Sequence, residues 1–209
     1  MTDEPEWWRG ASPPDQLPSE WPNFREFTTG RHTGALATPP LVPGLGLRQR
    51  FFFRAQVSDV ELSLTDAQLG VAWSEFDRCL FTQRVRPVLN EHGIAAQGSW
   101  GIRASIYRDC VFDRVRFKTL GGFTLSAARF ENCTFRNCRW EGHFAHSCDL
   151  VDCVFIGKMT GCVWFGEDRE GRSPPRVNDI RGNDFTDTTF SNVGWRFDFP
   201  VADQIWPEG

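Results

Sequence analysis

The sequence has one tyrosine, two methionines, no long apolar run and no excess of basic residues. The lack of any stretch of twenty apolar residues argues against a membrane-spanning helix. A formal net charge of -4 argues against a strongly basic protein that binds nucleic acid directly. Met1 leads into Thr2, Asp3 and Glu4 rather than a basic and then apolar stretch, so no secretory signal is visible and we expect the cytoplasm.

What the chain has in quantity is large rings without a hydroxyl group, with 19 phenylalanines and 9 tryptophans among 209 residues. A chain of this length is able to bury a real core as one ordinary domain or two small ones. The first 47 residues hold eight of the 13 prolines, which excludes long helices and central strands. We therefore expect an irregular proline-rich arm over 1–47, a folded body over 48–199, and a cap or tail over 200–209.

Large apolar residues recur with a period of five, which fits neither an amphipathic helix nor an alternating strand. Counted in fives, the series is Leu120, Leu125, Phe130, Phe135, Trp140, Ala145, Leu150, Phe155, Thr160 and Phe165, then Ile180, Phe185, Phe190 and Trp195. Twelve of these fourteen positions are large aliphatic or aromatic residues. Phe76 with Phe81, and Phe112 with Phe117, repeat the spacing in other phases. We call each such position a centre.

The position two residues before each centre, which we call the slot, is mostly small, and six of the seven cysteines occupy it. The pattern predicts a narrow coil in which each five-residue unit sends one large and one small side chain inward. The expected core is Phe112, Phe117, Phe130, Phe135, Trp140, Leu150, Phe155, Phe165, Phe185, Phe190, Cys133, Cys138 and Cys153.

Three segments carry a family resemblance: Cys133-Thr134-Phe135-Arg136-Asn137, Cys153-Val154-Phe155, and Asn183-Asp184-Phe185-Thr186-Asp187. They resemble the A(D/N)LXX unit of the pentapeptide-repeat family, and the resemblance extends with interruptions over about 58–195. It implies an all-β fold, a right-handed quadrilateral β-helix with four units per coil. Residues twenty apart then stack, so Phe135 is expected over Phe155 and Cys133 over Cys153.

One unit breaks the size rule, because Ala145 is a small centre and its slot holds His143. Either the two volumes are exchanged, or Phe144 turns inward and strains the register.

Two insertions are expected to interrupt the coil. The first, at about 82–101, is read as a short helix or a projecting loop. The second, at about 166–177, is charged, contains prolines and is expected to be exposed. The residues after Trp195 are too apolar for a free tail, which predicts that they cap the last coil or join two copies of the chain.

The tightest group of possible metal ligands is Cys138, His143, His146 and Cys148. Its spacing matches no usual zinc pattern, and the repeat places both cysteines inside, so we expect no metal and no cofactor. Stacked side chains at Cys133 and Cys153 point in parallel, which strains a disulfide. We expect all seven cysteines to be reduced.

Nothing in the sequence indicates an enzyme, since it contains no phosphate loop and no nucleophile beside a base. A rod filled by its own side chains also leaves no deep pocket. Recognition is expected on loops and surface acids. The candidate interaction residues are Glu167, Asp168, Glu170, Asp179, Asp184 and Asp187.

The expected function is a non-enzymatic protein-interaction or scaffold module whose partner is another protein. The family resemblance implies an alternative, a DNA mimic that binds DNA gyrase or a related topoisomerase and protects it from quinolone-type inhibitors. Mimicry requires an acidic face. Residues 100–165 instead hold nine Lys or Arg against six Asp or Glu, whereas residues 178–209 have a net charge of -4. The charge is therefore basic in the middle of the rod and acidic at its ends.

Overall fold

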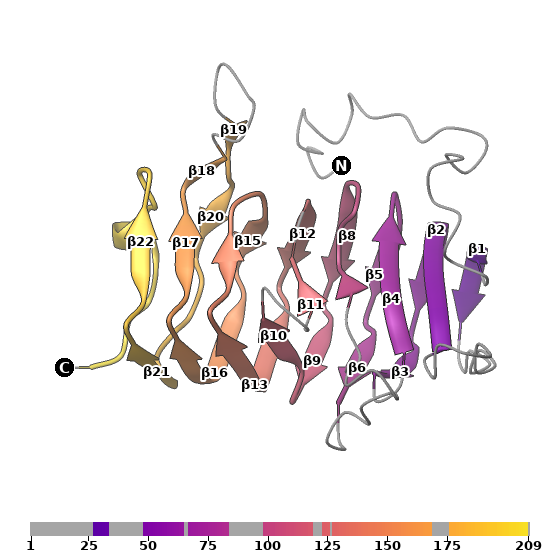
Figure 1. Ribbon diagram of the computed structural model, residues 1–209, viewed down its shortest axis with the longest axis horizontal. Helices are drawn as coiled ribbons and strands as arrows, with labels where there is room; N and C mark the ends of the chain where they lie inside the picture. Colours follow the sequence, from indigo (N-terminus) through magenta and orange to yellow (C-terminus); the bar gives the residue numbers. More distant parts are fainter. Residues whose placement is uncertain are drawn as a thin grey trace.

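The computed structural model describes residues 27–33, 48–64, 67–83, 98–118, 123–125, 127–168 and 176–208. They form the expected right-handed quadrilateral β-helix, with one short 3-10 helix, η1 (Val201–Asp203), and no α-helix in these ranges. No helix among these residues is long and apolar enough to span a membrane. Figure 1 shows a rod whose strands run across its long axis, with β1 and β2 at one end and β22 at the other.

The coil has four sides, each a stack of parallel strands, and four of the longer strands bend around a corner to serve two sides. Side 1 consists of the second half of β2 (Arg48–Ser58), then β5 (Glu75–Asp77), β8 (Ser105–Arg108), β12 (Ala128–Glu131), β15 (Asp149–Val151) and β20 (Ile180–Arg181). Side 2 consists of β3 (Glu61–Ser63), β6 (Leu80–Thr82), β9 (Val111–Asp113) and the first halves of β13 (Thr134–Glu141) and β16 (Val154–Thr160).

Side 3 consists of β10 (Arg116–Lys118), the second halves of β13 and β16, and β21 (Thr188–Ser191). Side 4 consists of the first half of β2, then β4 (Ala67–Ala72), β7 (Gly98–Ser99), β11 (Phe123–Thr124), β14 (Phe144–Ala145), β17 (Val163–Phe165) and β22 (Gly194–Arg196). A hairpin of β18 (Glu167–Asp168) and β19 (Arg176–Val177) leaves the rod after side 4 and projects above it in Figure 1.

The expectation of an irregular arm over 1–47 is wrong at one segment. Residues 27–33 form strand β1 (Phe27–Thr33), which pairs in parallel with β2 along sides 4 and 1. The sheet therefore begins inside the proline-rich region, where a seven-residue run free of proline leaves every backbone N–H available for pairing. The rest of the expected arm, 1–26 and 34–47, lies outside the described residues.

The core of side 2 is a column of stacked phenylalanine rings. Phe81, Phe112, Phe135, Phe155 and Phe185 follow one another with ring centroids 4.7 to 4.8 Å apart. This spacing is that of neighbouring strands, so the register of the sheet sets the ring stacking. The expected position of Phe135 over Phe155 is confirmed. At the end of the column, Trp206 stacks on Phe185 at 5.2 Å and caps the last coil.

Some slots hold apolar side chains, such as Val115 and Ala128. Others hold small side chains that are able to donate a hydrogen bond, and five of these donate to the carbonyl group of a centre in the coil below. The donors and carbonyls are Cys133 Sγ to Tyr107 at 3.4 Å, Cys153 Sγ to Phe130 at 3.5 Å, Asn183 Nδ2 to Leu150 at 2.9 Å, Cys138 Sγ to Phe112 at 3.2 Å, and Thr188 Oγ1 to Phe155 at 2.7 Å. Burial raises the pKa of the Cys133 and Cys138 thiols, which keeps both protonated as donors. All seven cysteines are free.

The five-residue period is interrupted within β16, and two of the expected centres are therefore wrong. Arg136 pairs with Ile156, but Cys138 pairs with Gly157, so β16 is one residue short at this corner. Met159 and Trp164 therefore point inward, both fully buried, instead of Thr160 and Phe165. Phe165 remains buried, but it packs against the His146 ring at 4.2 Å, outside the main core cluster.

The volumes of His143 and Ala145 are exchanged. His143 is 1% exposed and Ala145 is 3% exposed, whereas Phe144 is 49% exposed and does not turn inward. The His143 ring packs against Trp140, with centroids 5.7 Å apart, and fills the space that a large centre would have taken.

The first insertion is shorter than expected. Thr82 and Gln83 are buried in the coil, and the coil resumes at Gly98, which pairs with β4. Trp100 is fully buried, a core residue that the five-residue pattern missed because it is out of phase with the flanking centres Phe81 and Phe112. Residues 84–97 lie outside the described part of the chain.

The expected core residues Phe112, Phe117, Phe130, Phe135, Trp140, Leu150, Phe155, Phe185, Cys133, Cys138 and Cys153 all belong to the main buried cluster. Phe190 is partly buried and packs against that cluster.

Candidate functional site

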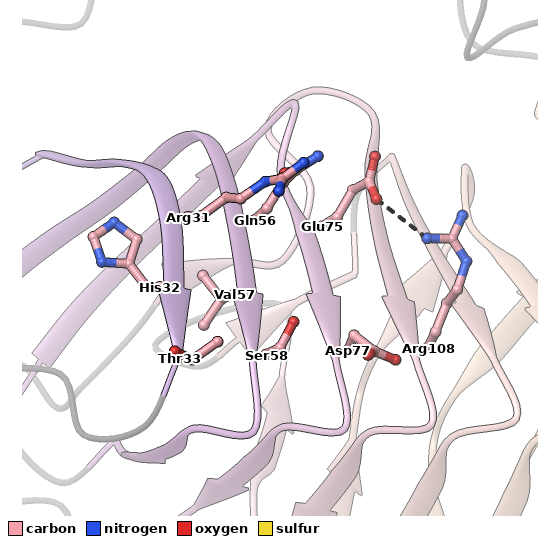
Figure 2. A pocket seen from close by; sticks show the side chains of 9 residues that line it. All are labelled: Arg31, His32, Thr33, Gln56, Val57, Ser58, Glu75, Asp77 and Arg108. Atoms are coloured by element: carbon pink, nitrogen blue, oxygen red, sulfur yellow. Dashed lines mark hydrogen bonds and ion pairs between the residues drawn. The ribbon is translucent and has the colours of Figure 1, made fainter.

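The rod has surface depressions but a filled interior among its described residues. One depression, of about 380 Å³, lies near the N-terminal end on side 1. Its lining is Arg31, His32, Thr33, Gln56, Val57, Ser58, Glu75, Asp77 and Arg108. Figure 2 shows these side chains in rows across β1, β2, β5 and β8, as the parallel register requires.

The polar groups of this depression are engaged with one another. Arg31 Nε donates to Gln56 Oε1 at 2.8 Å, and Arg108 Nη1 pairs with Glu75 Oε2 at 3.3 Å. Arg108 Nε also pairs with Glu131 Oε2 at 3.0 Å. The site is shallow and balanced in charge, and the described lining contains neither a cysteine nor a pair of carboxylates in contact. It can hold a polar group of a partner, but it has no arrangement that would activate a nucleophile.

The acidic candidates lie near the C-terminal end, in different settings. Asp187 is exposed, and Asp184 Oδ1 accepts a hydrogen bond from the backbone N–H of Thr186 at 2.8 Å, which forms a local turn. Glu167 is half-buried at the base of the hairpin, and Asp168 is buried at 4% exposed. The expectation of an exposed Asp168 is therefore wrong, because the hairpin folds its base against the coil. Glu170 lies outside the described residues.

Asp179 belongs to a second depression of about 370 Å³ beside the hairpin. Its lining is Gly166, Val177, Asn178, Asp179, Ile180, Arg181, Asp198, Pro200 and Asp203. Asp179 Oδ1 pairs with Arg181 Nε at 3.0 Å, and Asp179 Oδ2 pairs with Arg129 Nη1 at 2.9 Å. The structure thus brings one predicted acid together with Asp198 and Asp203, which the sequence analysis had counted only in the net charge.

A buried ionic network connects this hairpin to the coil, and sequence reasoning missed it. Asp149 is fully buried, Arg176 Nη2 pairs with its Oδ1 at 2.6 Å, and Arg129 Nη1 lies 3.3 Å from its Oδ2. Burial raises the pKa of Asp149, and the two arginines oppose that shift. The backbone N–H of Asp179 also donates to Asp149 Oδ1, at 2.9 Å. Asp149 thereby ties the returning strand of the hairpin to the coil.

The possible metal ligands do not converge. Cys138 and Cys148 occupy slots on sides 3 and 1, and no group of three or more metal-ligating side chains occurs among the described residues. Neither ring nitrogen of His143 has a hydrogen-bond partner there. Burial lowers the pKa of His143 to about 4, so the ring is neutral near pH 7.

Comparison with known proteins gives one weak similarity. No protein-family model and no curated protein matches the chain. A solved structure of QnrB1, a plasmid-mediated fluoroquinolone resistance protein, is similar at 14% sequence identity and a TM-score of 0.27, covering 87% of this chain and 79% of that chain. A likeness of this size carries no argument about what the chain binds.

Proposed function

We propose that this chain is a non-enzymatic pentapeptide-repeat rod that binds another protein through its surface. The observation that carries the proposal is the filled interior, in which stacked rings and donor slots occupy the inside of every described coil. Such a rod has no internal volume for a substrate, and its two described depressions are open.

The projecting hairpin is the element best suited to specificity. Val177 on β19 is 71% exposed, the highest value among the large apolar residues described. The Asp149 network holds the base of the hairpin against side 1, so an apolar contact is presented from a rigid support.

A cross-linking experiment in the cells that make the protein tests this function. The full chain carries a tag, and covalently captured proteins are identified by mass spectrometry. We expect one partner to be recovered with the parent and with Phe144→Asp, an exposed apolar control on β14, and to be lost with Val177→Asp. If the parent recovers nothing above the level of an unrelated rod, the proposed function is wrong.

A second candidate is the gyrase-directed DNA mimic, which is favoured by the acidic C-terminal end, where Asp184, Asp187 and Asp203 accompany Asp179 and Asp198. A supercoiling assay with purified gyrase, the full chain and a fluoroquinolone separates the two candidates. Inhibition of supercoiling, or rescue from the drug, would make the mimic the leading function. If the chain has no effect in this assay, the protein-binding scaffold remains the leading function.

We also propose that two copies of the chain associate through the C-terminal segment. Trp206 caps the last coil, yet Val201 and Ile205 are 47% and 54% exposed at the same end. Sedimentation velocity tests this: the parent should sediment as a dimer, and the double variant Val201→Asp with Ile205→Asp as a monomer. A parent that is monomeric at high concentration contradicts it.

A further inference from the structure

A basic patch lies on side 3 and on the corner between sides 2 and 3. It consists of Arg114, Arg116, Arg136, Arg139 and Lys158. The parallel register places Arg116, Arg139 and Lys158 in one row on neighbouring strands. Neighbouring strands are about 4.8 Å apart, so the row is about 10 Å long. Arg139 is 67% exposed, and Lys158 is exposed as well.

The patch contains two carboxylates, which neutralise only part of its charge. Glu141 accepts from Arg116 at 3.0 Å and from Arg139 at 2.5 Å, and these arginines lower the pKa of Glu141. One carboxylate thus bridges two successive steps of the row. At the next step, the residue aligned with Glu141 is Thr160, which has no charge.

Lys158 therefore stands beside Arg139 without a bridging acid, and it makes no ion pair within the described part of the chain. On the adjacent corner, Asp113 is shared by Arg114 at 3.9 Å and Arg136 at 3.5 Å. Its side chain is only 7% exposed, whereas those of the two arginines are 56% and 47% exposed. Five cations face solvent against two partly covered carboxylates.

We propose that the basic patch docks a short acidic segment of the partner protein, with a partner carboxylate between Arg139 and Lys158. This inference rests on the proposed protein-binding function and assigns the chemistry of the partner. The partner carboxylate would bridge Arg139 and Lys158 in the same way that Glu141 bridges Arg116 and Arg139, one strand further along the row. A guanidinium binds a carboxylate through two parallel donors, which an arginine row repeats at each step.

The size of the patch favours a short acidic peptide over nucleic acid. A length of about 10 Å corresponds to about three residues of an extended chain, or about three nucleotides of one strand of a duplex. Beyond Lys158 the row continues to Thr189, and the corner beside it carries the exposed acid Asp187. A long polyanion that followed the row would meet the acidic end of the rod, whereas a short segment would not.

Fluorescence anisotropy with the full chain tests the proposal. The probe is a short fluorescein-labelled peptide of alternating glutamate and serine, and the competitor is an unlabelled DNA duplex. The double variant Arg139→Gln with Lys158→Gln removes two charges from the patch. The matched control, Arg181→Gln with Arg196→Gln, removes two charges from exposed residues of the last coil.

We expect the double patch variant to weaken peptide binding by about tenfold or more, as the loss of two charge-assisted contacts predicts, and the control to leave it within about twofold. Binding should weaken as salt shortens the screening length. Equal binding by the patch variant, or displacement by DNA at lower concentrations than by unlabelled peptide, overturns the proposal. A partner that cross-links equally well to the patch variant would leave the proposed function standing and remove this surface from it.

Discussion

The ring of Phe135 lies over the ring of Phe155, with centroids 4.8 Å apart and planes inclined by 12°. Phe112 lies on the other side of Phe135 at the same distance. Phe135 is therefore enclosed by its own column, and its burial is complete. The stability of each coil in such a rod depends on its neighbours, because each centre contacts the coils before and after it.

Phe135→Ala should lower the free energy of unfolding by about 3 to 5 kcal/mol, since it opens a cavity between two rings that the strand spacing prevents from closing. Urea unfolding followed by tryptophan fluorescence measures this. Phe144→Ala is the matched control, because Phe144 is 49% exposed and should give little change. Equal stability of Phe135→Ala and the parent would contradict the column.

The stability of the fold should depend on pH through His143. Its folded pKa of about 4 lies below the ordinary value of 6.5, because burial disfavours the charged ring. Between these values the unfolded chain binds a proton that the folded chain does not. The free energy of unfolding therefore falls as the pH is lowered from about 6.5 to 4, by about 3 kcal/mol.

His143→Leu should remove this part of the acid sensitivity, measured as the difference from the parent in urea unfolding at several pH values. The control His32→Gln changes a histidine at the far end of the rod, on β1, and should keep the parent profile. A His143→Leu profile parallel to that of the parent would show that the ring does not titrate as its burial predicts.

Asp149→Asn should destabilise the protein by about 3 kcal/mol, because breaking a buried ion pair leaves a buried charge without its partner. Arg176 loses a carboxylate contact of 2.6 Å, and its side chain is only 8% exposed. Asp59→Asn provides the contrast, since Asp59 pairs with Arg78 at the surface, where both side chains are more than half exposed. The test is the urea midpoint of the two variants, and equal midpoints would argue against a buried network.

Gly157 is required by the one-residue deficit in β16. Its φ is 134°, and a Cβ atom there would lie 3.2 Å from the carbonyl oxygen of Cys138. Gly157→Ala should cost about 1 to 3 kcal/mol of stability, which thermal unfolding would register as a lower Tm. In Gly194→Ala the new Cβ meets only side-chain atoms of Val163 and Arg196, at 3.8 to 4.0 Å, so little change is expected. A Tm for Gly157→Ala as high as that for Gly194→Ala would contradict the requirement.

Much of the fold was predictable because the repeat is local. A centre every five residues with a small slot before it fixes which side chains point inward, and Phe135 lies over Phe155, twenty residues further along the chain, as that rule demands. The shift to Met159 and Trp164 was not predictable from the period, because one missing residue at Gly157 is absorbed by a corner and only the pairing of strands reveals it.

The candidate sites, in contrast, could not be predicted from the local pattern of the sequence. Nothing in the sequence distinguishes Asp149 from a surface acid. In the structure it is buried and pairs with Arg129 and Arg176, which lie twenty and twenty-seven residues away. The row of Arg116, Arg139 and Lys158 is likewise invisible as a run, since its members lie 23 and 19 residues apart. The sequence by itself determined the coil and its core, because burial follows a short-range period. Only the tertiary structure decided which charges meet, because that depends on the lengths of the insertions between coils.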